Sequence, residues 1–263
     1  MKAGQKIKEK FMERASRAGI FFGLFYTAFQ AVITASNNQR KIFLNSLSRQ
    51  IFFTGVQAIT PIVIIAFVMG GAVIIQAINQ LPRVGAENMI GSILVVVIVR
   101  EFGPLLISFI LIGRSATAIT TEIAEMRVSG QFQNLLTIGV NPSLYLFAPR
   151  IWGMILSLFV LKTFFIASAL VGGFLMARAA TYVNFRFLLK GFFSNLTIID
   201  LTGMVIKSFF IGSVIAIIAI REALRVKGSS TEIPQATSRT VLTAIFYVLL
   251  IDIVFAGLVY TVL

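Results

Sequence analysis

Five long runs of apolar residues dominate this 263-residue chain, in which only 13% of the residues are charged. They lie near residues 51–77, 89–112, 144–176, 197–220 and 240–262. Each run reaches the roughly 20 residues that a helix needs to cross a bilayer. Inside lipid the backbone must satisfy its own hydrogen bonds, so we expect each run to be helical. The long alternation of polar and apolar residues typical of a membrane β-barrel is missing from the sequence. The sequence therefore predicts an all-α, polytopic integral membrane protein with five transmembrane helices.

The chain is strongly basic, with a formal net charge of +13. In a soluble protein this balance would suggest nucleic acid as a partner, but in a membrane protein cationic residues gather in the cytoplasmic loops. If the N-terminus is cytoplasmic, the cytoplasmic segments hold 16 Lys and Arg residues and the outer loops hold 4. We therefore expect no nucleic acid partner, a cytoplasmic N-terminus and a C-terminus at the outer face.

An apolar, uncharged stretch near residues 18–36 precedes the five runs and is rich in phenylalanine. Its phenylalanines are Phe21, Phe22, Phe25 and Phe29. Basic residues flank it on both sides, so a crossing would leave one basic cluster on the outer face, against the positive-inside rule. We expect an N-terminal interfacial amphipathic helix within a basic cytoplasmic segment, residues 1–50, followed by a transmembrane domain, residues 51–263. A crossing at 18–36 would reverse the charge bias.

Two charges stand within the second run, in the sequence Arg100-Glu101-Phe102-Gly103-Pro104. Charged groups near the middle of a membrane cost several kcal/mol unless they are paired or hydrated. Adjacent helical residues point in different directions, so Arg100 and Glu101 need not pair with each other. Pro104 removes a helical hydrogen bond and disfavours helical geometry at Gly103, which predicts a kink. These residues form either a polar spot in a substrate pathway or a buried structural ion pair, with Asp252 or Lys207 as partner.

The stretch between the second and third runs predicts a cytoplasmic helix near residues 120–138. Thr120 or Thr121 can cap this helix, with Glu122 and Glu125 in its first turns, where the helix dipole favours acidic groups. Gly139, Asn141 and Pro142 follow and would end it. A helix with charged and apolar groups on a cytoplasmic surface suits the docking of a partner, although an ordinary solvated connector would have the same composition.

Small residues recur four positions apart in the apolar runs and permit close helix approach. The pairs are Ala66 with Gly70, Ser168 with Gly172, and Ser208 with Gly212. The chain has no Cys and no His, which removes thiol nucleophiles, imidazole bases and the usual zinc and haem ligands. No phosphate-binding loop of the Gly-x-x-x-x-Gly-Lys-Ser/Thr type occurs. We therefore expect no catalytic residue, no metal site and no ATP site in this chain.

Three blocks of sequence resemble the MlaE/YrbE permease family, the membrane subunits of lipid transporters associated with MCE-domain proteins. The blocks are Arg100 to Pro104 with Gly113, Arg114, Glu122, Met126 and Arg127; Gly139 to Pro142 with Pro149 and Arg150; and Ala236 to Val241. The likeness extends over residues 48–260. Residues 228–235 and Ser115 depart from the family pattern, since glycines are common at both places in the family.

The resemblance implies a permease homodimer coupled to two cytoplasmic ABC ATPase subunits, which would bind the ATP and magnesium. It implies a phospholipid cavity between the two permease copies, and an MCE-domain protein on the outer side. The lipid pathway would include Arg100, Glu101, Gly103 and Pro104. The helix seated on the ATPase would include Glu122, Glu125, Met126, Arg127 and Gln131. A compact chain without a transit peptide favours the bacterial inner membrane.

Two other classes of protein remain as alternatives. An ion-coupled carrier or channel would use Arg100, Glu101, Lys207 and Asp252 as a charge relay and would need no ATPase. An intramembrane enzyme is disfavoured, because the chain shows no pairing of a nucleophile with a base.

Overall fold

The computed structural model describes residues 23–30, 32–34, 36–85, 89–137, 139, 141–180 and 185–262, and across these residues the regular structure is entirely helical. Five helical segments are long and apolar enough to cross a membrane. They are Gln39–Gln80, Ile90–Val128, Ser143–Met176, Ile198–Leu224 and Ser230–Leu258. The prediction of an all-α, multi-pass membrane protein with five transmembrane helices is confirmed.

The first segment starts before the apolar run that predicted it. It comprises α2 (Asn37–Thr54), a short 3₁₀ turn η1 (Val56–Ala58) and α3 (Ile59–Gln80). Ser36 precedes α2, and its backbone N–H donates to Gln39 Oε1 at 3.0 Å, which satisfies a donor at the helix N-terminus. The basic residues of α2 interrupt the apolar pattern without breaking the helix, since Arg and Lys are good helix formers.

The second segment is one long helix with two widened turns. It comprises α4 (Ile90–Leu94), the π-helical segment η4 (Val95–Phe102), α5 (Gly103–Leu111), the π-helical segment η5 (Ile112–Ala116) and α6 (Thr117–Val128). The span predicted to end near residue 112 thus runs on to Val128.

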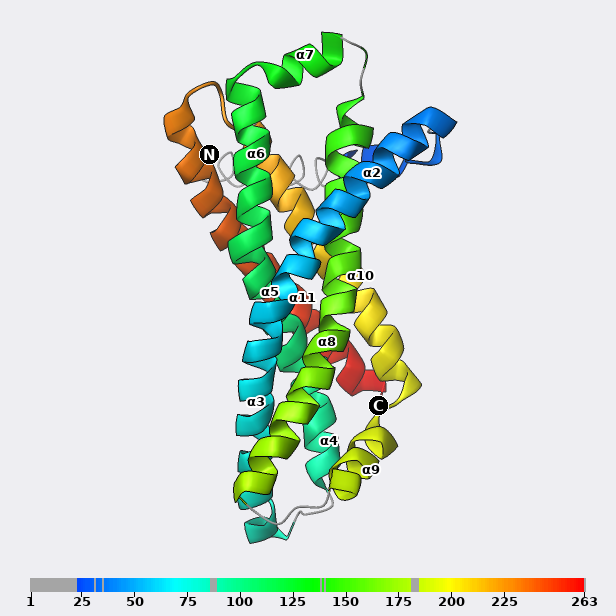
Figure 1. The fold of residues 1–263 in the computed structure, drawn as a ribbon, viewed down its shortest axis with the longest axis vertical. Helices are drawn as coiled ribbons and strands as arrows, with labels where there is room; N and C mark the ends of the chain where they lie inside the picture. The colour runs from blue at the N-terminus through cyan, green and yellow to red at the C-terminus, as the bar shows by residue number, and fades with distance from the viewer. Residues whose placement is uncertain are drawn as a thin grey trace, which may run out of the picture.

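The predicted cap at Thr120 or Thr121 is wrong, because both residues lie inside α6 and Thr120 is fully buried. The stretch 120–138 is not a single helix either. Gly130, with φ of +75°, separates α6 from α7 (Gln131–Thr137), and Gly139 with φ of +74° follows α7. Figure 1 shows α7 lying across one end of the molecule.

The remaining segments are long helices joined by short connections. The π-helical segment η6 (Ser143–Phe147) leads into α8 (Ala148–Ala180), and α9 (Phe185–Asn195) precedes α10 (Ile198–Leu224). The short helix η7 (Ser230–Glu232) leads into α11 (Ile233–Val262). At 1.5 Å per residue, the 33 residues of α8 extend about 50 Å, well beyond the hydrocarbon core. A helix of this length is too long for a perpendicular span, so α8 has to tilt or extend beyond the bilayer.

Small residues allow α3 and α8 to pack closely along their length, as Figure 1 also shows. Gly70 of α3 faces the backbone of Ala169, and Gly172 of α8 faces the backbone of Phe67. On α10, a Cβ at Gly212 would lie 2.8 Å from the Cα of Ile155. The small-residue pairs of the sequence thus mark real helix contacts, in agreement with the prediction.

The N-terminal residues that the structure describes pack against the bundle through aromatic rings. The ring of Phe25 meets Phe209 of α10 edge-on at 5.8 Å, and Phe29 lies 6.3 Å from Trp152 of α8. Among the described residues no candidate membrane span precedes Gln39. Phe21 and Phe22 lie outside the described residues. An interfacial position for this helix stays a prediction.

Candidate functional site

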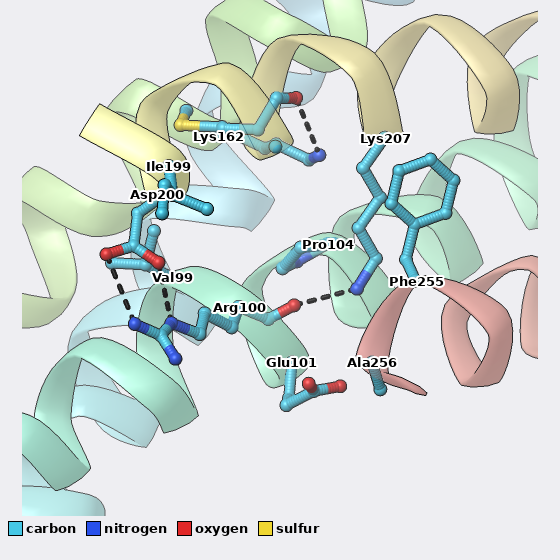
Figure 2. A pocket seen from close by; sticks show the side chains of 12 residues that line it. Val99, Arg100, Glu101, Pro104, Lys162, Ile199, Asp200, Lys207, Phe255 and Ala256 are labelled. Carbon is cyan, nitrogen blue, oxygen red and sulfur yellow. Dashed lines mark hydrogen bonds and ion pairs between the residues drawn. The ribbon is translucent and has the colours of Figure 1, made fainter. Parts of the chain in front are cut away.

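A small polar cavity lies among η4, α5, α8, α10 and α11, at the two charges singled out in the second run (Figure 2). Its lining residues are Val99, Arg100, Glu101, Pro104, Lys162, Ile199, Asp200, Gly203, Met204, Lys207, Phe255 and Ala256. We call these residues, together with Asp252, the polar pocket. The cavity measures about 30 Å³, which is room for water but not for a lipid.

Arg100 forms a two-point ion pair with Asp200. Its Nε donates to Oδ1 at 2.6 Å and its Nη2 to Oδ2 at 3.3 Å. Only 1% of the Asp200 side chain is exposed, so the pair is shielded from water on the carboxylate side. A charge-assisted fork of this kind fixes the orientation of the guanidinium as well as its charge.

The same carboxylate caps the start of α10. Thr197 donates from its backbone N–H at 2.9 Å and from its hydroxyl at 2.7 Å to Asp200 Oδ2. Asp200 lies in the first turn, where the helix dipole favours an anion. Asp200 was not among the residues predicted for the site. Asp252 or Lys207 was suggested as the ion-pair partner of the two charges, and for Arg100 the structure corrects this to Asp200. The Thr-x-x-Asp pattern at 197–200 was the sequence signal for this N-terminal cap.

Lys207 forms the second ion pair of the polar pocket, with Asp252 of α11. Both side chains are 8% exposed. Lys207 Nζ also donates to the backbone oxygen of Arg100 at 2.7 Å (Figure 2). Pro104 explains why that oxygen is free to accept, because proline has no N–H for the carbonyl four residues before it. Lys207 therefore ties α10 to α11 through a side chain and to η4 through the backbone.

The helix absorbs Pro104 without leaving helical geometry, which corrects the expectation for Gly103. Gly103 has φ of −56° and ψ of −57°, in the right-handed helical region. The preceding turns, Val95–Phe102, widen to π-helix instead. A Cβ at Gly103 would collide with the carbonyl of Ile98 and lie 3.3 Å from the Phe165 ring. Gly103 is thus required by close packing at the widened turn.

Glu101 and Lys162 complete the charges of the polar pocket. Figure 2 shows Glu101 directed away from the guanidinium of Arg100, in line with the expectation that these two adjacent charges need not pair. Glu101 instead lies within electrostatic reach of Lys207 and Asp252. Lys162 is 2% exposed, and its Nζ donates to the Met204 oxygen at 3.4 Å. The three cations and three carboxylates balance, which is the condition for burying so much charge.

The residues predicted to couple to a partner lie on α6 and at the start of α7, far along the chain from the polar pocket. Glu122 pairs with buried Arg150 of α8 at 2.8 Å, and Arg127 donates to the Leu224 oxygen of α10. Met126 packs against the core. Glu125 and Gln131 are exposed. The structure therefore joins Glu122 and Arg127 to neighbouring helices and leaves Glu125 and Gln131 facing outward.

A larger cleft of about 610 Å³ lies between α2, α6, η6 and α8. Arg49, Glu122 and Arg150 are its charged lining residues. Within the described part of the chain no group of three or more acidic side chains is arranged to hold a metal ion.

The comparisons with known proteins identify the class of membrane protein. Residues 47–258 match the family model described as Permease MlaE, so the chain belongs to the MlaE permease family. A probable ABC transporter permease of Rickettsia typhi is 26% identical over 248 residues, covering 94% of each chain. The intermembrane phospholipid transport system permease MlaE of Haemophilus influenzae is 28% identical over 220 residues, covering 81% of this chain and 82% of the relative.

A relative from a plastid extends the comparison beyond bacteria. The chloroplastic protein TRIGALACTOSYLDIACYLGLYCEROL 1 of Arabidopsis thaliana is 24% identical over 217 residues, covering 82% of this chain and 62% of the relative. The family membership confirms the resemblance seen in the three sequence blocks. The chain is an ABC transporter permease subunit, a type of subunit that lacks an ATPase domain.

Proposed function

We propose that this chain is the membrane-spanning subunit of an ATP-driven phospholipid transporter in the bacterial inner membrane. The main support for this proposal is the polar pocket. Its three cations and three carboxylates lie on η4, α8, α10 and α11, within the segments long enough to cross the membrane. Ionisable groups inside a membrane mark functional pathways by default. Membership of the family and the name of the Haemophilus relative support phospholipid as the substrate.

The proposed assembly is a permease homodimer with two cytoplasmic ABC ATPases and an MCE-domain protein on the outer side. The polar pocket of one chain has room for water alone, so a phospholipid needs further walls, which a second copy would supply. Residues 51–263 would form the permease domain and residues 1–50 the cytoplasmic basic segment.

In the proposed mechanism, ATP-driven motion changes the affinity of the dimer cavity for lipid. Arg100 and Glu101 would meet the head group, at the turn that Gly103 and Pro104 shape. Arg100 keeps 17% of its side chain exposed, so its guanidinium is not sealed behind Asp200. Glu122, Glu125, Met126, Arg127 and Gln131 would transmit movement from the ATPase, with Glu125 and Gln131 offering the exposed contacts.

Arg100→Ala is expected to lower ATP-dependent phospholipid transfer at least about tenfold, because a charged hydrogen-bonding group contributes roughly 1.5–3 kcal/mol. The variant should still copurify with its ATPase, since Arg100 lies far along the helix from α6. Transfer between labelled vesicles by the reconstituted complex is the measurement. Arg83→Ala, which removes an exposed cation outside the polar pocket, is the matched control. Unchanged transfer by a fully assembled Arg100→Ala complex contradicts the assigned role.

The second candidate, an ion-coupled carrier or channel, draws on the linked charges of Lys207, Asp252 and Glu101. Gentle detergent purification separates the two. A permease should bring a nucleotide-binding subunit and bound phospholipid, identified by mass spectrometry. A carrier should purify alone and move ions without ATP.

A further inference from the structure

Three helices, α6, α10 and α11, are joined by buried hydroxyl groups near the end that carries α7. Thr120 Oγ1 of α6 lies 3.0 Å from Thr240 Oγ1 of α11 and 3.2 Å from the Ala219 oxygen of α10. Both threonines are 0% exposed. We call Thr120, Thr240 and the Ala219 carbonyl the hydroxyl clamp. Thr121, the next residue of α6, lies 3.4 Å from Thr237, which is about one turn before Thr240 on α11.

The hydrogens available allow both contacts of the hydroxyl clamp to form together. A hydroxyl donates one hydrogen and accepts at two lone pairs. Each hydroxyl also has a carbonyl of its own helix within reach, Ala116 at 2.9 Å for Thr120 and Ala236 at 3.0 Å for Thr240. When Thr240 donates to Thr120, the Thr120 hydrogen is shared between the Ala219 and Ala116 carbonyls. A single side chain on α6 then holds α10 and α11 at once, in surroundings without water where such bonds are strongest.

Charged side chains also link these three helices, at positions between the hydroxyl clamp and the end that carries α7. Arg127 of α6 donates to the Leu224 oxygen of α10. Glu222 of α10 is 2% exposed and lies 3.2 Å from Arg225 and 3.6 Å from Arg239 of α11. Each pair of helices is therefore linked by polar side chains at this end.

The polar pocket links α10 and α11 a second time, farther along. Lys207 stands 12 residues before Ala219, and Asp252 stands 12 residues after Thr240. At 1.5 Å per residue, both offsets are about 18 Å, so the polar pocket and the hydroxyl clamp are equally far apart along α10 and along α11. Lys207 also holds the Arg100 oxygen, on the same continuous helical segment as Thr120. The stretch between the junctions is filled by buried apolar residues such as Ile211, Ile215 and Val248.

We infer that the hydroxyl clamp is the element that couples movement of the α6–α7 end to the polar pocket, with Thr120 and Thr240 as positioning residues. Three helices tied at both ends move as one body, so a displacement of α6 reaches Lys207 and Asp252. With the hydroxyl clamp removed, α6 can slide along an apolar interface and the displacement is lost. This inference rests on the proposed ATP-driven lipid transport.

The test uses Thr120→Val, Thr240→Val and the double variant in the complex with its ATPase, reconstituted in phospholipid vesicles. Valine keeps the shape of threonine and removes the hydroxyl. Phospholipid moved per ATP hydrolysed should fall about three- to tenfold in each single variant, as expected for one buried hydrogen bond. The double variant should match Thr120→Val, because that single change already removes the contacts with both Thr240 and the Ala219 oxygen. The melting temperature of the complex and its ATP hydrolysis rate are measured alongside.

Two control variants separate coupling from folding. Thr117→Val removes a hydroxyl that bonds only carbonyls of its own helix, Gly113 and Arg114, and should keep the wild-type ratio. Thr120→Ser retains the hydroxyl and should therefore keep the wild-type amount of phospholipid moved per ATP hydrolysed. The inference is overturned if Thr120→Val keeps the wild-type ratio of lipid to ATP, or if transfer and hydrolysis fall together with the melting temperature. A wild-type complex that transfers no phospholipid would instead overturn the proposed function.

Discussion

Lys207→Met is expected to destabilise the protein by about 3–5 kcal/mol, because removing one partner of a buried ion pair leaves an uncompensated charge. Lys207 is the cation next to the buried Asp252, and Glu101 lies within reach of the same carboxylate. Its loss also leaves the Arg100 oxygen without the donor that Pro104 cannot supply. A lower melting temperature of the purified protein in detergent, at equal lipid content, is the measurement.

Two further variants make the Lys207 prediction specific. Lys227→Met removes an exposed lysine and should melt with the wild type, since surface charges contribute little. The combination of Lys207→Met with Asp252→Leu should recover much of the lost stability, because an apolar pair can replace a buried ion pair at little cost. A Lys207→Met protein as stable as Lys227→Met would show that the ion pair does not hold α10 and α11 together.

Gly70→Ala is expected to cost about 3 kcal/mol or more by forcing α3 and α8 apart, which is at the upper end for overpacking a core. A Cβ at Gly70 would stand 2.5 Å from the Cα and 2.6 Å from the carbonyl carbon of Ala169. Both are backbone atoms, so no rotamer change relieves the collision. Thermal unfolding in detergent and the yield of folded protein measure the effect.

Gly257→Ala provides the matched control for this helix contact. Gly257 lies in α11, and within the described part of the chain no atom outside its own helix backbone and chain neighbours stands within 4 Å of the position its Cβ would take. Alanine is the better helix former by roughly 0.8–1 kcal/mol, so this variant should be neutral or more stable. Equal melting temperatures for the Gly70 and Gly257 variants would contradict the close packing of α3 on α8.

Much of the fold could be predicted from hydropathy because lipid dictates both the length and the helical form of a spanning segment. The third segment begins within one residue of the predicted start and ends at the predicted residue. The second and fourth segments also begin within one residue of their predicted starts. The clear misses are the starts of the first and fifth segments and the end of the second, where a helix continues past its apolar part. Thr117–Val128 and Ser230–Arg239 are polar, yet they stay helical because they pack against one another and α10.

The candidate site could be predicted only in part. Arg100 and Glu101 stood out because charge is costly in an apolar run, and Lys207 and Asp252 for the same reason. Their pairing depends on how distant helices are rotated and shifted against each other. Asp200 lies 100 residues from Arg100. It stands near the start of a span, where a carboxylate is not unusual and so does not indicate a functional site. Lys162 likewise reads as an isolated lysine until α8 is placed beside Met204.

The carbonyl that Lys207 holds belongs to Arg100, but residue 104 decides whether it is available. Main-chain oxygens are the same in all amino acids, so natural variation at position 100 can alter the guanidinium without disturbing the anchor of the lysine. Any other residue at position 104 has a backbone N–H that can donate to the Arg100 oxygen, which would then no longer be free for Lys207. We therefore expect evolutionary covariation to join positions 104 and 207, two residues without a direct hydrogen bond, more tightly than positions 100 and 207.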